Sequence, residues 1–216
     1  GCRQQGLVAA EAEGEVLATN IGCTSLTDSS CLRSATVRQL LDAVGPEVTN
    51  GAFVGRNIGP IVDQYVLQGS PDEVIAQGAH NPVPLIIGAN TEETGVWAFN
   101  ALTQQQYEGL VRGQFGATVG NLILARYPVA EYATPQAAYV AVSTDSQFIC
   151  PARRVAQSAS AHSQPVYVYR FAKGFESSSL QNAGAFHGIE LFYLFGKVSE
   201  LETYAASESD QRIERA

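Results

Sequence analysis

The segment VPLIIGAN, residues 83–90, is the feature that most constrains the fold of this chain. It is an almost uninterrupted apolar run of strand length, and the polar residues TEET follow it directly. A strand that carries apolar residues at consecutive positions is typically covered on both faces, as the strands of parallel sheets are. The segment therefore predicts a central strand of a parallel sheet.

The order of the other segments supports this prediction. Residues 9–22 have apolar positions at helical spacing and end in a glycine, and residues 34–45 repeat this pattern with Ser34 as the expected N-cap. Residues 70–78 have a proline at the first helical position and the serine-to-glutamate spacing of a capping box, Ser70 to Glu73. The remaining expected elements are a strand or extended arm over 59–67, helices over 103–116, 118–128 and 134–160, and a strand over 164–172. This order indicates an α/β fold with a mostly parallel sheet and helices on both faces.

Composition limits the function classes. The chain has 216 residues, 45% of them hydrophobic, which suffices for the core of one domain or a large part of one. A net charge of −8 argues against a nucleic-acid partner, because a phosphate-binding surface is basic. No apolar run reaches the ~18 residues that a membrane span requires. Methionine and a signal-peptide pattern are both absent, so we expect an internal piece of a longer polypeptide.

The cysteines bear on the compartment. Cys23 and Cys31 flank the polar stretch TSLTDSS, and two thiols joined by so short a loop readily reach disulfide distance. Two unrelated free thiols are the alternative. A bridge favours an oxidising location, secreted or periplasmic. Cys2 and Cys150 make the count even, but the sequence does not pair them.

The sequence predicts no metal site. It contains no C-x-x-C motif, and His80, His162 and His187 lie too far apart to form a local zinc motif.

Polar loops follow the two main predicted strands. The first loop, ANTEETG, carries Glu92 and Glu93, and the second leads to His187. Ligands of open α/β sheets bind beyond the carboxyl ends of the strands, so a carboxylate and an imidazole should reach the same rim. Such a pair suits general-base catalysis, because the carboxylate fixes the imidazole tautomer and stabilises the imidazolium. A helix N-terminal acid and a packed or capping histidine are the alternatives.

Two motifs, VPLIIGANTEETG and AFHGIELFYLFG, occur in this order about ninety residues apart. They resemble two segments of the type-B carboxylesterases, the family of cholinesterases and fungal lipases. The first resembles the Asn-x-Asp/Glu-Glu loop with the catalytic acid, and the second the His-Gly-x-Glu segment with the catalytic histidine. Three further segments resemble parts of the same family. GCTSLTDSSCLRS is similar to its disulfide loop, GPIVD to its Pro-x-x-Asp arm, and TDSQFICPARRVA to its Thr-Asp helix. The resemblance covers nearly the whole chain and implies an α/β-hydrolase fold.

The resemblance assigns a role to each matching residue. Glu93 would be the acid of a catalytic triad and His187 its general base. Glu92 takes the preceding acidic position, which is more often solvated or structural. Glu190 matches an acid that supports the histidine, and Asp145 matches a buried aspartate of the helix entry. For Asp145, an ordinary helix N-cap is an equally good interpretation.

Trp97 and Phe99 follow the acid loop and are candidates to line an acyl pocket, although ordinary packing is the more frequent role of a lone tryptophan in an α/β core. Two positions depart from the family pattern. Gln64 follows Asp63 where the family usually has glycine, and Thr94 stands where glycine is common after the acid.

The nucleophile of the implied triad is absent from the sequence. No G-x-S-x-G elbow and no Gly-Gly oxyanion stretch occurs. In α/β-hydrolases the order is serine, acid, histidine, so both elements are expected upstream, which makes residues 1–216 a C-terminal portion of one domain, truncated at both ends. The expected function is hydrolysis of a small-molecule carboxylic ester by acyl transfer, with no cofactor and no metal. A non-catalytic extracellular adhesion or binding module of the same family is the alternative.

Overall fold

The structure is a computed structural model, and it describes residues 4–24, 29–44, 48–50, 53–55, 59–97, 101–162, 165–176, 180–202 and 204–215. The chain divides into two compact units. The first comprises Gly1–Thr49 and Val54–His80, and the second comprises Asn50–Phe53 and Asn81–Ala216. Cys2 and Phe99 lie outside the described residues.

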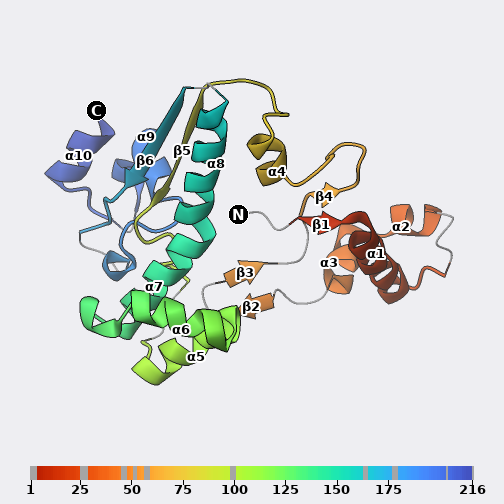
Figure 1. The fold of residues 1–216 in the computed structure, drawn as a ribbon, viewed down its shortest axis with the longest axis horizontal. Coiled ribbons are helices and arrows are strands. Elements are labelled where there is room, and N and C mark those ends of the chain that lie inside the picture. The colour runs from red at the N-terminus through yellow and green to blue at the C-terminus, as the bar shows by residue number, and fades with distance from the viewer. Residues whose placement is uncertain are drawn as a thin grey trace. The chain divides into compact units, whose positions relative to one another are not determined.

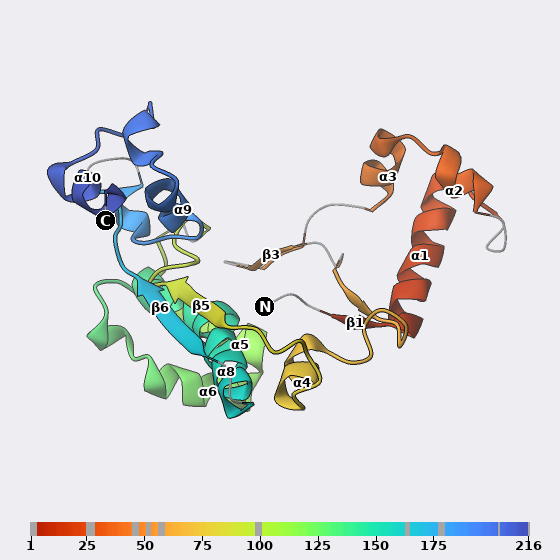
Figure 2. The ribbon, with the colours of Figure 1, turned by 90° about the horizontal axis from the view of Figure 1, so that it is seen from above.

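The first unit is mainly helical. Figure 2 shows its long helix, α1, packed beside α3. Two short strands, β1 and β4, pair in parallel. The elements are β1 (Gln5–Gly6), α1 (Leu7–Ile21), α2 (Ser30–Ser34), α3 (Val37–Ala43), β4 (Ile61–Val62) and α4 (Pro71–Ala76). The short strands β2 (Val48–Asn50) and β3 (Phe53–Gly55) form a further pair, of which Asn50 and Phe53 are assigned to the second unit.

Two predicted helix ends are confirmed. Helix α1 stops at Gly22, whose φ of 92° is the left-handed conformation that glycine adopts at helix C-termini. Helix α4 begins at Ser70, whose hydroxyl accepts a hydrogen bond from the backbone N–H of Glu73. The Glu73 carboxylate accepts one from the backbone N–H of Ser70 in return, which completes the capping box.

The predicted start of the second helix is wrong. Ser34 is the last residue of α2, and its hydroxyl donates to the carbonyl of Cys31. The N-cap of α3 is Thr36, which forms a capping box with Gln39. Two reciprocal hydrogen bonds satisfy two N–H groups of the first turn, whereas a single serine cap satisfies one.

The structure joins Cys23 and Cys31 by a disulfide, with Cα atoms 5.8 Å apart. The bridge connects the end of α1 to α2. Cys150 is a free and exposed thiol.

The turn after β4 forms although glycine is absent from it. Gln64 adopts a φ of 62°, a conformation that glycine occupies at less cost. The turn is held by Asp63, because its Oδ1 atom accepts hydrogen bonds from the backbone N–H groups of Tyr65, Val66 and Leu67 at 2.9 to 3.0 Å. These bonds, those from Leu67 and Tyr65 above all, lower the pKa of the Asp63 carboxyl.

The second unit contains the main parallel pair. Strand β5 (Leu85–Asn90) pairs with β6 (Val166–Phe171) in parallel over six positions, from Leu85 opposite Val166 to Asn90 opposite Phe171. Helix α8 packs along both strands (Figure 1). The other helices of the unit are α5 (Gln104–Phe115), α6 (Ala117–Arg126), α7 (Pro135–Thr144), α8 (Cys150–Ala161), α9 (Ile189–Leu194) and α10 (Glu208–Glu214), with short 3₁₀ turns at Val129–Glu131, Gln181–Ala183 and Val198–Glu200.

Parallel pairing in an α/β arrangement is as predicted, but coverage of β5 on both faces is not. Ala89 and Asn90 are buried at the carboxyl end, whereas Ile86 is 73% exposed and its neighbour on β6, Tyr167, is 64% exposed. Alternate residues of a strand point to opposite faces. Within the described residues, one face of the amino half of the pair therefore lies open.

The long helix predicted over 134–160 is interrupted. Residues Asp145–Ile149 form a π-helical segment between α7 and α8. A π-helical turn of this kind occurs within an α-helix and has no simple sequence pattern. The helical periodicity of residues 134–160 therefore did not indicate the interruption.

A buried carboxylate anchors the C-terminal part of the second unit. Asp210 is fully buried and accepts hydrogen bonds from the hydroxyls of Tyr193, Tyr204 and Ser207, and the ammonium of Lys173 lies 3.2 Å from it. Burial by itself raises the pKa of the Asp210 carboxyl, but the hydrogen bonds outweigh burial and hold the pKa well below its usual range. The carboxylate therefore ties α9 and α10 together.

Within the described ranges, no helix combines the length and the apolar character needed to cross a bilayer.

Candidate functional site

The two loops after β5 and β6 meet at the carboxyl end of the parallel pair. The Nδ1 atom of His187 lies 2.6 Å from Oε2 of Glu93, a hydrogen bond between residues 94 positions apart. The Glu93 side chain is 7% exposed and that of His187 is 52% exposed. A buried carboxylate thus faces one nitrogen of an imidazole that is otherwise accessible.

The backbone around Glu93 fixes its orientation. Its second oxygen, Oε1, accepts a hydrogen bond from the backbone N–H of Asn90 at 2.8 Å. Its carbonyl accepts one from the backbone N–H of His187 at 3.1 Å. A carboxylate oxygen opposite Nδ1 favours the tautomer that is protonated there, which leaves Nε2 able to accept a proton.

Asn90, which the sequence reasoning did not single out, connects the site to α9. It is completely buried, and its side-chain N–H₂ group donates to the carbonyl of Phe186 at 2.8 Å and to the carboxylate of Glu190. Asn90 therefore links Glu190 on α9 to the end of β5. Its place as the first residue of the Asn-x-Asp/Glu-Glu motif, at the end of the predicted strand, was the available signal.

Aromatic rings flank the imidazole. The ring of Trp97 lies 5.4 Å from that of His187, and the ring of Phe148 lies 5.2 Å from it, both in tilted geometry. Trp97 is 37% exposed, so its ring also borders solvent beside the imidazole. Phe148 belongs to the π-helical segment and was not expected from the sequence.

Asp145 lies in the scaffold that carries Phe148. Its carboxylate accepts a hydrogen bond from the hydroxyl of Tyr127 at 2.6 Å, which links the π-helical segment to the end of α6. Burial and this carboxylate raise the pKa of the Tyr127 hydroxyl. Helical residues precede and follow Asp145, so it does not serve as a helix N-cap.

The residues on either side of Glu93 also form hydrogen bonds. Glu92 accepts hydrogen bonds from the backbone N–H of Ala185 at 2.8 Å and from the hydroxyl of Thr91. Thr94 is fully buried, with its hydroxyl 2.5 Å from that of Ser143 on α7. A threonine at this position therefore anchors the acid loop to α7.

A Glu–His pair of this kind can accept a proton from a nucleophile, but it needs a nucleophile to act on. Among the residues that the structure describes, Glu93 is the hydrogen-bond partner of the imidazole, and no serine or cysteine is hydrogen-bonded to it. The described residues also contain no cluster of three or more potential metal ligands of the His, Cys, Asp and Glu types.

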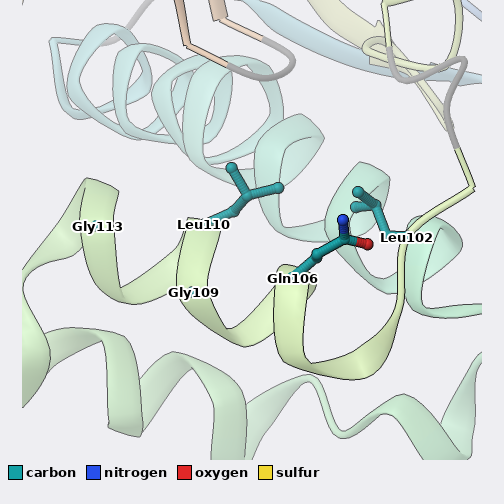
Figure 3. Close-up of a pocket in the computed structure, with 5 residues that line it drawn as sticks. All are labelled: Leu102, Gln106, Gly109, Leu110 and Gly113. Atoms are coloured by element: carbon teal, nitrogen blue, oxygen red, sulfur yellow. The ribbon is translucent and has the colours of Figure 1, made fainter.

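A separate depression of about 550 Å³ runs along α5 (Figure 3). It is lined by Leu102, Gln106, Gly109, Leu110 and Gly113. All of these residues belong to α5 or directly precede it, so the depression is a surface feature of that helix and is not part of the Glu–His pair.

Comparison with known proteins shows similarity to the carboxylesterase family. The carboxylesterase family model matches residues 4–216. The "Crystal protein" of Dictyostelium discoideum is 30% identical over 193 residues, which cover 82% of this chain and 34% of that protein. The para-nitrobenzyl esterase of Bacillus subtilis (strain 168) is 28% identical over 160 residues, covering 72% and 31%. Neuroligin-2 of Homo sapiens is 28% identical over 207 residues, covering 84% and 24%.

A solved structure of PNB esterase matches the whole chain with a TM-score of 0.73 at 24% identity, and the match covers 44% of that structure. This likeness shows the α/β-hydrolase fold. The chain spans 24% to 34% of the length of the relatives named above.

Proposed function

Because this chain belongs to the carboxylesterase family, we propose that it supplies the acid and the base of a serine carboxylester hydrolase. Glu93 is the acid and His187 the base. The observation that carries the proposal is the 2.6 Å hydrogen bond from Nδ1 of His187 to a carboxylate that is almost fully buried. Burial strengthens this interaction, since the surrounding dielectric constant is lower than that of water.

In the proposed reaction a serine hydroxyl attacks the carbonyl carbon of an ester. His187 takes the hydroxyl proton at Nε2 and returns it to the departing alcohol, and the Glu93 carboxylate stabilises the imidazolium between the two transfers. Water, activated by the same base, then releases the acid from the acyl enzyme. Backbone N–H groups of an oxyanion hole hold the charge that develops on the carbonyl oxygen.

The serine and the oxyanion hole belong, in this proposal, to a longer polypeptide of which residues 1–216 form the C-terminal portion of one α/β-hydrolase domain. Two observations support it. The sequence contains no G-x-S-x-G elbow, and the chain spans 24% to 34% of the length of the three relatives whose sequences are compared above. The chain order of α/β-hydrolases places the serine before the acid.

The surroundings of the imidazole suggest a role for the remaining candidates. Trp97 borders solvent beside His187 and is proposed to line the acyl pocket, together with Phe99. Glu190 supports the histidine segment through Asn90, as its hydrogen bond indicates. The substrate class is a small carboxylic ester, with no cofactor. The disulfide favours a secreted or periplasmic location.

The test is hydrolysis of a p-nitrophenyl ester by the longer polypeptide. We expect turnover, covalent labelling of one serine by a fluorophosphonate, and loss of both in a His187→Ala variant. The 216-residue chain alone should be inert. Turnover by this chain that disappears in His187→Ala would reveal a nucleophile within it and refute the proposed location of the serine. A longer polypeptide without a reactive serine would instead favour a non-catalytic adhesion or binding module.

A further inference from the structure

We propose that Glu92 is a positioning residue, which holds the histidine loop against the acid loop so that His187 meets Glu93. The inference rests on the proposed function, because it concerns the same acid and base. The resemblance left a solvated or a structural role for this glutamate, and its contacts on the histidine loop agree with the structural one.

The two loops are joined by hydrogen bonds on both sides of Glu92. Its carboxylate oxygen Oε2 accepts from the backbone N–H of Ala185 at 2.8 Å, and its own backbone N–H donates to the carbonyl of Ala185 at 3.1 Å. The hydroxyl of Thr91 donates to the same Oε2 atom and orients the carboxylate. Glu92 therefore forms hydrogen bonds with both the backbone N–H and the backbone carbonyl of Ala185.

Glu92 packs so closely against the histidine loop that the facing residue, Gly184, has no room for a side chain. A Cβ atom added to Gly184 would lie 2.6 Å from Oε2 of Glu92 and 2.7 Å from its Cδ and Cγ atoms. Gly184 also has a φ of 64°, which a side chain rarely tolerates. On the acid loop, a Cβ atom added to Gly95 would lie 2.0 Å from the carbonyl oxygen of Ala183. The backbones of the two loops thus pack directly against each other around Glu92.

Ala185 lies two residues before His187, so the position of its backbone limits where the His187 side chain can lie. The next link between the loops is the hydrogen bond from the backbone N–H of His187 to the carbonyl of Glu93. Without the side-chain acceptor for the N–H of Ala185, backbone hydrogen bonds alone join this part of the two loops, and the half-exposed imidazole can shift away from Oε2 of Glu93. A misplacement of about 1 Å in a catalytic group can lower the rate on the order of 10²-fold.

We expect different outcomes for three substitutions of Glu92. In Glu92→Gln the amide oxygen still accepts from the N–H of Ala185, so kcat should stay close to that of the wild type. In Glu92→Ala no acceptor remains, and kcat should fall about 10²-fold, the effect of a 1 Å displacement, with KM unchanged. Glu92→Asp keeps the charge but shortens the side chain, so it should resemble Glu92→Ala.

The experiment measures kcat and KM for a p-nitrophenyl ester in the longer polypeptide, together with the low-field NMR signal of the proton between Nδ1 of His187 and Glu93. We expect the signal in the wild type and in Glu92→Gln, and its loss or broadening in Glu92→Ala and Glu92→Asp. If Glu92→Ala does not fold, the comparison of Glu92→Asp with Glu92→Gln decides.

Unchanged kcat and an unchanged proton signal in Glu92→Asp or Glu92→Ala would overturn the inference. Equal losses in Glu92→Gln and Glu92→Asp would overturn it as well, because the charge or the fit of the carboxylate would then matter and not the acceptor. A wild-type polypeptide that shows the proton signal but hydrolyses no ester would refute the proposed function alone, and the NMR comparison would still test the position of His187.

Discussion

Replacing Glu93 by glutamine tests the role of the acid, because the structure dictates how the amide must lie. One carboxylate oxygen accepts from the backbone N–H of Asn90 at 2.8 Å, and the other faces Nδ1 of His187 at 2.6 Å. Asn90 belongs to β5, so its N–H cannot turn away. The amide oxygen of Gln must therefore take the side of Asn90, which leaves the N–H₂ group facing the imidazole.

An N–H₂ group can only donate, so Nδ1 has to act as the acceptor and the imidazole proton moves to Nε2. The nitrogen that should receive the serine proton is then already protonated. For triad acids the corresponding acid-to-amide replacement lowers kcat by about 10⁴-fold. At 1.36 kcal/mol for each factor of ten, this loss corresponds to about 5.4 kcal/mol of transition-state stabilisation.

The assay is kcat for a p-nitrophenyl ester in the longer polypeptide, with the thermal midpoint of each variant as a check on folding. Glu92→Gln is the matched control, because it makes the same chemical change at the adjacent residue and keeps the acceptor for Ala185. A Glu93→Gln variant that retains more than about a tenth of the wild-type kcat, less than 1.4 kcal/mol of loss, would refute the reasoning. So would a structure in which Glu92 reaches His187 while Glu93 faces solvent.

Further predictions concern stability. Peptide mapping without reductant should recover Cys23 and Cys31 as one cross-linked fragment, and reduction should cost roughly 2–3 kcal/mol of unfolding free energy; two freely alkylatable thiols would contradict this. Gln64→Gly should stabilise the protein by up to about 1 kcal/mol in denaturant melts, because Gln64 has a positive φ, and an equal loss would show that its side chain matters more than its backbone. Asp210→Asn should lower the unfolding free energy by about 1.5–3 kcal/mol per charged hydrogen bond lost. The pKa of folded Asp210 lies below its unfolded value of about 3.9, so the stabilisation by this carboxylate is complete above that pH and declines as the pH falls. The Asp210→Asn variant lacks the carboxylate and should lose less unfolding free energy on acidification than the wild type. An equal loss in the two proteins would contradict this.

Local patterns were predictable where the interacting groups are close in the chain. The capping box of Ser70 and Glu73 and the terminal glycine of α1 depend on hydrogen bonds that span a few residues, so residue type and spacing suffice. The disulfide follows from a separation of 8 residues for the same reason. The start of α3 was missed because two competing caps, Ser34 and Thr36, lie within one turn of each other.

The sequence by itself determined the α/β class through its strand-length apolar runs, and two motifs in a fixed order, which resemble a known family, indicated the two residues of the proposed chemistry. Only the tertiary structure decided what surrounds them. The ring of Phe148 reaches His187 from a π-helical turn, and the carboxylate of Glu92 contacts Ala185 across 93 residues of sequence. Such contacts depend on the register of β5 against β6 and on how closely two loops pack, and both are set by the burial of side chains from many distant segments at once.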